Sequence, residues 1–235
     1  MTSLLLALIG IPAGLLLDAL AVRFAAGPGE EEEPSPPATA TMPRGAEAGS
    51  LVIEHSAQAW ARRLLTAGAT AGLFAAAGAR FEAAADLAIV IPYICVLIVC
   101  AATDLLSLRV PNAVTYPALL GALIAGAAMP DARISEVLIG GALAGVVFLV
   151  PALLTGGIGM GMGDVKLAAF AGLALGLTNV APALLLTALG GGAVALLLLL
   201  TGLRKKGEPI PYAPFISAGA LVALLWQGAA FVELT

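Results

Sequence analysis

Two aspartates stand at the edges of long apolar stretches, where an acidic side chain is costly and often functional. Asp104 ends the apolar segment 86–103, and Asp164 follows the run 156–163, in which five of eight residues are glycine. Glycine allows close backbone approach. Each acid also has a purely structural interpretation. Asp164 could cap the helix that begins there, and Asp104 could be an interfacial acid with Arg109 as its counter-charge.

Taken together, the two acids suggest hydrolysis by a pair of carboxyl groups. Two carboxylates that share a site cannot both ionise easily, so one keeps a proton while the other is ionised. The ionised group acts as general base toward a water molecule that attacks a peptide carbonyl, and the protonated group donates to the carbonyl oxygen. This chemistry needs no metal and no cofactor, and we expect neither. The lone His55 lies in a polar segment without an evident partner.

The elements that must position these acids are membrane helices. Of the 235 residues, 60% are hydrophobic and 11% are charged, against roughly 25% charged in ordinary soluble domains. The apolar blocks are about 15 to 25 residues long, which suits a hydrocarbon core roughly 30 Å thick. They lack polar faces, which argues against a soluble protein. The sequence therefore predicts an all-α polytopic bundle whose surroundings are the lipid bilayer. Nucleic acid is not an expected partner, because the chain has no basic stripe.

We expect about eight transmembrane helices. The region 1–26 forms the first, the region 27–59 is an acidic, proline-rich loop expected to be flexible, and the region 60–235 forms the remaining core. The segments of that core are 62–79, 86–103, 112–129, 134–155, 164–177, 180–203 and 212–232. A tight turn near Thr178 to Pro182 should join the two segments that follow Asp164.

The basic residues orient this bundle by the positive-inside rule. With the N-terminus outside the cytoplasm and eight crossings, nine of the eleven basic residues fall in cytoplasmic loops, and only Arg80 and Arg133 fall on the other side. The nine are Arg23, Arg44, Arg62, Arg63, Arg109, Lys166, Arg204, Lys205 and Lys206. The same arrangement places Asp104 and Asp164 at the cytoplasmic face, at a common depth where they could meet.

The residues around both aspartates resemble those of the type IV prepilin peptidases. Gly161-Met162-Gly163-Asp164-Val165-Lys166-Leu167 is similar to the GxGD signature of that family, which continues V-K-L. Asp104 with the downstream Val110-Pro111-Asn112 resembles its first catalytic aspartate and the I-P-N that follows. Ile210-Pro211-Tyr212-Ala213-Pro214-Phe215 resembles I-P-F-G-P-F. The stretch 14–23 is more weakly similar to the first-helix motif. Four matches in the right order favour this family over presenilin-like proteases, which share GxGD alone.

The resemblance implies an aspartyl endopeptidase embedded in the cell inner membrane. Its substrate would be a type IV prepilin or a pseudopilin, held in the same membrane by an apolar N-terminal helix. A short basic leader would be removed at the cytoplasmic face, in the service of type IV pili or type II secretion. The implied catalytic pair is Asp104 and Asp164. The implied supporting residues are Gly161, Gly163, Lys166, Pro111 and Asn112.

The chain also departs from that family. Typical bacterial members carry a cytoplasmic domain with two CxxC pairs that binds zinc, and many methylate the new N-terminus with S-adenosylmethionine. Here the corresponding region 27–59 contains no cysteine. We therefore do not expect zinc, and whether any N-methyltransferase activity remains is left open. Asp18 stands where the family usually has asparagine.

Two functions of other classes remain as alternatives. One is a transporter, in which intramembrane acids carry ions or protons. It would place acids deeper in the helices, and no such acids or internal repeat are evident. The other is a structural membrane subunit whose acids pair with a partner's bases. Such a subunit would tolerate changes of aspartate to asparagine, whereas a protease would not.

Overall fold

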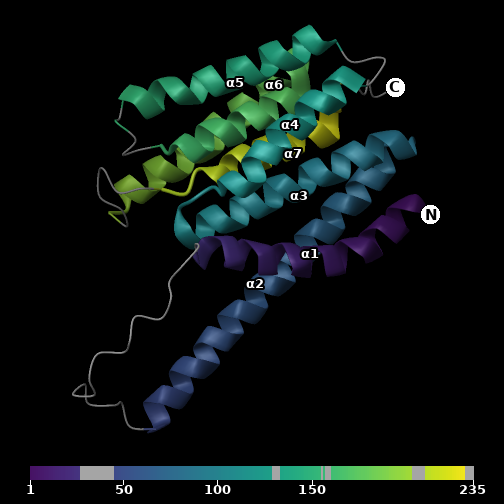
Figure 1. Ribbon diagram of the computed structural model, residues 1–235. Coiled ribbons are helices and arrows are strands. Elements are labelled where there is room, and N and C mark those ends of the chain that lie inside the picture. The colour runs from purple at the N-terminus through teal and green to yellow at the C-terminus, as the bar shows by residue number, and fades with distance from the viewer. Residues whose placement is uncertain (27–44, 129–132, 155, 157–159, 203–209, 231–235) are drawn as a thin grey trace.

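The computed structural model describes residues 1–26, 45–128, 133–154, 156, 160–202 and 210–230, with only the backbone described for residues 45–56. The described residues form α-helices and no strand (Figure 1). The helices are α1 (Thr2–Ala26), α2 (Gly45–Arg80), α3 (Ala84–Ser107), α4 (Asn112–Ala128), α5 (Ile134–Leu154), α6 (Met162–Leu200) and α7 (Ala213–Gln227). The prediction of an all-α fold is confirmed.

Four of these helices, α1, α3, α5 and α6, are long and apolar enough to cross a membrane, and α4 and α7 are shorter apolar helices. Large apolar side chains cover their outer faces, among them Leu16, Leu120, Leu153 and Leu197. Such faces suit a hydrocarbon environment, where no polar face is needed. The predicted membrane helix bundle is therefore confirmed, while the number of eight crossings stays a prediction.

Helix α6 is divided into two parts at Gly176, whose backbone is non-helical (φ 71°, ψ 174°). A positive φ is freely available to glycine. The first part of α6 packs against α5, where Gly172 lies against the backbone of Gly140. The second part packs against α7, where Gly219 lies against Ala183 and Thr187. The chain therefore breaks at Gly176, just before the position near Thr178 to Pro182 where the sequence predicted a turn, and those residues are themselves helical.

Helices α1 and α2 cross at small residues. A Cβ atom on Gly10 would lie 2.6 Å from Cα of Ala71, and one on Gly14 would lie 2.5 Å from Cα of Ala67. Small residues four positions apart let two membrane helices approach this closely. The crossing fixes the first two helices against each other, and α1 also packs on α3.

Helix α2 begins at Gly45 and therefore includes residues 45–59 of the region predicted as a polar loop. All prolines of that region precede Gly45, so the stretch after them contains nothing that must break a helix. The rest of the predicted loop, 27–44, lies outside the described residues.

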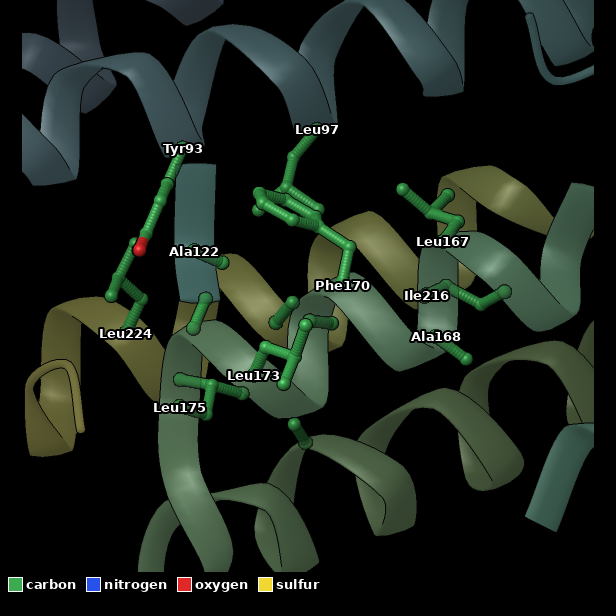
Figure 2. Close-up of a cluster of buried hydrophobic side chains, with 14 of the residues drawn as sticks. Tyr93, Leu97, Ala122, Leu167, Ala168, Phe170, Leu173, Leu175, Ile216 and Leu224 are labelled. Carbon is green, nitrogen blue, oxygen red and sulfur yellow. The ribbon is translucent and has the colours of Figure 1, made fainter. Parts of the chain in front are cut away.

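The buried core gathers apolar side chains from α3, α4, α6 and α7 (Figure 2). Tyr93 of α3 meets Phe170 of α6 edge to face, with ring centroids 5.3 Å apart. Leu97 of α3 and Leu224 of α7 are buried in the same cluster. This core holds together the helices whose ends carry Asp104, Asp164 and the start of α7.

Candidate active site

Asp104 lies in the last turn of α3 and is only 4% exposed. The helix ends at Ser107, because Leu108 has a left-handed backbone (φ 53°, ψ 35°) and donates its N–H to the Asp104 carbonyl at 2.8 Å. The chain then turns into α4, whose first turn is closed by Thr115 donating its N–H to the Pro111 carbonyl at 3.1 Å. The Val110-Pro111-Asn112 stretch therefore serves as the corner between α3 and α4.

The Asp104 carboxylate caps the N-terminus of α7. Its Oδ2 accepts the backbone N–H of Ala213 at 2.9 Å, and the adjacent N–H of Tyr212 also acts on it electrostatically. The first N–H groups of a helix lack partners within the helix, and the positive end of the helix dipole favours a carboxylate. The Ile210–Phe215 stretch thus contributes backbone donors to the site.

Asp164 lies in the first turn of α6 and is 8% exposed. Its Oδ2 accepts the backbone N–H of Gly161 at 3.1 Å, which caps the helix. Its Oδ1 is buried and has no hydrogen-bond partner in the part of the chain that the structure describes. Buried polar atoms are rarely left without a partner. Helix capping therefore accounts for one oxygen of this carboxylate and leaves the other free for a different role.

The two carboxylates belong to one site. Asp164 interacts electrostatically with Asp104, and the Tyr212 phenol interacts electrostatically with Asp164. The residues come from the end of α3, the start of α6 and the start of α7. The structure thus brings together the two acids that the sequence singled out, at one end of the bundle.

The supporting residues predicted from the sequence join the two motifs to each other. A Cβ atom on Gly163 would lie 2.8 Å from Cβ of Val110, so the start of α6 can approach the α3–α4 corner only with glycine there. Lys166 donates from Nζ to Oδ1 of Asn112 at 2.7 Å. The same Nζ lies 4.7 Å from the centroid of the Tyr116 ring, a favourable cation–π distance. These contacts fix Asp164 relative to the end of α3.

The sequence did not indicate the surroundings of Tyr212. Its ring meets Phe148 with centroids 6.0 Å apart and Phe215 with centroids 5.9 Å apart, and it lies against Gly191. The run of three glycines at 190–192, inside an apolar stretch, was the one available signal. A glycine run shows that backbone or side chains approach closely but not which residue does so.

The described residues contain no group of side chains that could form a metal centre. No three histidine, cysteine, aspartate or glutamate side chains there are grouped so that they could hold an ion. Cys95 and Cys100 lie on α3 as free cysteines. The chemistry that the described residues offer is that of two neighbouring carboxyl groups.

Comparison with known proteins adds independent information. The sequence pattern of the type IV leader peptidase family matches residues 91–196, a segment that contains both aspartates. The chain is 38% identical over 159 residues to a prepilin leader peptidase/N-methyltransferase of Bacillus subtilis, covering 67% of this chain and 63% of that protein.

Two further relatives carry the same printed name. The protein of Aeromonas hydrophila is 34% identical over 136 residues, covering 56% of this chain and 47% of the relative. The protein of Pseudomonas aeruginosa is 36% identical over 80 residues, covering 34% and 28%. The chain thus matches less than two thirds of the length of each of these relatives. No solved structure matches it.

Proposed function

We propose that the chain is a membrane-embedded aspartyl endopeptidase, on the premise that its residues 91–196 match the type IV leader peptidase family. It removes the short basic leader of type IV prepilins or pseudopilins, with Asp104 and Asp164 as the catalytic pair. One observation carries the proposal. Two buried carboxylates from different helices interact at one site, although acids in such surroundings are costly.

The surroundings of the two acids fit a hydrolysis by general acid and base. One of two neighbouring carboxyl groups holds a proton and the other is ionised. The ionised group takes a proton from water as the water attacks the scissile carbonyl, and the protonated group donates to the carbonyl oxygen. The proton taken from water then passes to the departing amine. Oδ1 of Asp164 has no partner among the described residues, and this is the oxygen that we assign to the proton transfer.

We also propose that the site lies at the cytoplasmic face of the inner membrane, with the N-terminus outside the cytoplasm. Support comes from the side chains that bind the two ends of α7. Asp104 contacts the first turn of this helix, whereas Arg80 donates to its last carbonyls, of Leu225 and Trp226. Arg80 is one of the two basic residues that the sequence assigned to the opposite side. The acids and Arg80 therefore lie at opposite ends of the bundle.

The test is a cleavage assay in membranes or detergent with a prepilin and a pseudopilin as substrates. Wild type should trim the leader, and Asp104→Asn and Asp164→Asn should each be inactive while still folded. Asp86→Asn is the matched control, because Asp86 lies in the first turn of the same helix as Asp104, at its other end. Normal cleavage by both site variants would overturn the aspartyl mechanism and favour a transporter or a structural subunit. If wild type cleaves neither substrate, the proposed peptidase activity is refuted.

We propose peptidase activity without methyl transfer. The relatives' printed names join the two activities, but the region 27–59 of this chain has no cysteine for a zinc domain. Mass spectrometry of the trimmed product, formed in the presence of S-adenosylmethionine, tests this point. A product without an added methyl group is expected, and a methylated one would show that another part of the chain supplies the transferase.

A further inference from the structure

Tyr212 interacts with both carboxylates of the site through different atoms. The N–H of the residue that follows it, Ala213, donates to Asp104 at 2.9 Å, its own N–H acts electrostatically on Asp104, and its phenol interacts electrostatically with Asp164. It is the residue that immediately precedes α7, so its position sets where that helix begins. Any movement of Tyr212 must also move the N–H groups that hold Asp104.

The ring of Tyr212 packs against aromatic neighbours and occupies space that is open because a neighbouring residue is glycine. It packs against Phe148 of α5 and Phe215 of α7 at interplanar angles of 67° and 62°. A Cβ atom on Gly191 would lie 2.7 Å from both Cζ and Oη of the ring and 3.0 Å from Cε2. Well-packed interiors do not absorb such an overlap without displacement. Gly191 therefore provides the space that the ring occupies.

The next residue offers a natural comparison. A Cβ atom on Gly192 would have no described atom within 4 Å. Gly191 and Gly192 are neighbours in the second part of α6, so an alanine at either position changes the intrinsic helix propensity in the same way. Only the alanine at 191 would press on Tyr212.

We propose that Gly191 and Tyr212 are positioning residues for Asp104: the ring of Tyr212, seated on Gly191, fixes the first turn of α7, and this turn presents its N–H groups to the Asp104 carboxylate. The inference rests on the proposed peptidase function, because an effect on kcat can be measured only in an active peptidase. In this arrangement α6 serves both acids. Its first part carries Asp164 directly, and its second part controls Asp104 through Tyr212.

Kinetics of two alanine variants test the proposal first. Gly191→Ala should lower kcat by about tenfold to 100-fold, because small displacements of a catalytic group have effects of this size. KM should change little, since no group that would hold the apolar helix of the substrate is altered. Gly192→Ala should leave kcat within about twofold, as expected for a surface change that meets no neighbour. Equal kcat values for the two variants would overturn the proposal.

Variants of Tyr212 separate the ring from its hydroxyl. Tyr212→Phe keeps the packing and should retain kcat within about threefold, whereas Tyr212→Leu should fall about as far as Gly191→Ala. The double variant Gly191→Ala/Tyr212→Leu should be no worse than Tyr212→Leu alone, because the two changes act on one contact. If Tyr212→Phe is as poor as Tyr212→Leu, the hydroxyl itself takes part in the reaction and a positioning role is wrong.

Hydrogen–deuterium exchange provides a readout that does not depend on cleavage. The amides of Tyr212 and Ala213 should be protected in wild type and should exchange faster in Gly191→Ala and in Asp104→Ala, but not in Gly192→Ala. If exchange follows this pattern while wild type cleaves no prepilin, the positioning inference stands and the proposed function fails. If Gly191→Ala alters neither exchange nor kcat in an active enzyme, the positioning inference fails alone.

Discussion

The two ends of α7 are both bound by a charged side chain, but the two arrangements differ in their surroundings. At the C-terminal end, Arg80 donates to the carbonyls of Leu225 at 2.9 Å and Trp226 at 2.7 Å. At the N-terminal end, Asp104 accepts the N–H of Ala213 at 2.9 Å. Both charges complement the helix dipole. Arg80 is exposed, however, whereas Asp104 is buried beside a second acid.

This difference separates a contact that favours stability from one that is costly for stability. An exposed guanidinium that binds helix carbonyls satisfies unpaired acceptors at little desolvation cost. A buried carboxylate loses hydration, and a neighbouring acid adds repulsion. The Arg80 end is further held by Asn179, which donates to the Gly228 carbonyl at 3.2 Å. The Asp104 end therefore keeps an unfavourable arrangement that stability alone does not explain, as functional sites often do.

The largest expected effect contrasts the two ends of α7 directly. Asp104→Asn should reduce the cleavage rate by about 10²–10⁴-fold, because an amide cannot exchange protons in the reaction. Its melting temperature should stay equal or rise, since a buried charge is removed. Arg80→Gln should keep the rate within about twofold and lower the melting temperature by a few degrees. Rates and thermal melts in one detergent measure both, and the reverse pattern would refute the comparison.

A second prediction concerns the approach of α6 to the α3–α4 corner. Gly163→Ala should lower the rate by about tenfold or more, because its Cβ would lie 2.8 Å from Cβ of Val110 and displace the turn that carries Asp164. Val110→Ala added to it should restore part of the loss. Gly121→Ala in α4 is the control, since no described atom lies within 4 Å of its Cβ. If Gly163→Ala cleaves as well as Gly121→Ala, this close approach does not matter for the site.

A third, smaller effect is expected from the link between α6 and α4. Lys166→Met and Asn112→Ala should each lower the rate by about fivefold, because the exposed hydrogen bond between them contributes about 1 kcal/mol. The double variant should be no worse than either single one. Additive losses, measured with the same assay, would show that the two residues act separately.

The smallest effect on cleavage is expected at the other buried acid. Asp18 of α1 accepts Nε of Arg62 at 2.7 Å and is 1% exposed, while Arg62 is partly exposed. Asp18→Ala should leave kcat unchanged but lower stability by about 1–3 kcal/mol, the lower end being favoured because water still reaches Arg62. Denaturation in mild detergent measures the loss. The double variant Asp18→Ala/Arg62→Ala should recover part of it, and a stronger loss would show that the pair is not the cause.

The sequence by itself determined the helical membrane fold, the candidate acids and their motifs. Apolar composition acts locally, so it identifies membrane helices without knowledge of their neighbours. The position of Asp104 and Asp164 at segment ends also follows from the chain alone. The beginning of α2 at Gly45 was missed, because a polar helix lacks the apolar signal that marks its neighbours. The roles of both acids remain predictions that the assays above decide.

Only the tertiary structure decided what surrounds these acids. The bond from Ala213 to Asp104 joins residues 109 positions apart, and the seat of Tyr212 on Gly191 depends on how α6 turns back at Gly176. Lys166 likewise finds Asn112 only after α4 and α6 have packed. The physical reason is that hydrogen bonds and close packing act over a few ångströms, so their partners are set by the arrangement of helices in space, which apolar periodicity along one helix does not specify.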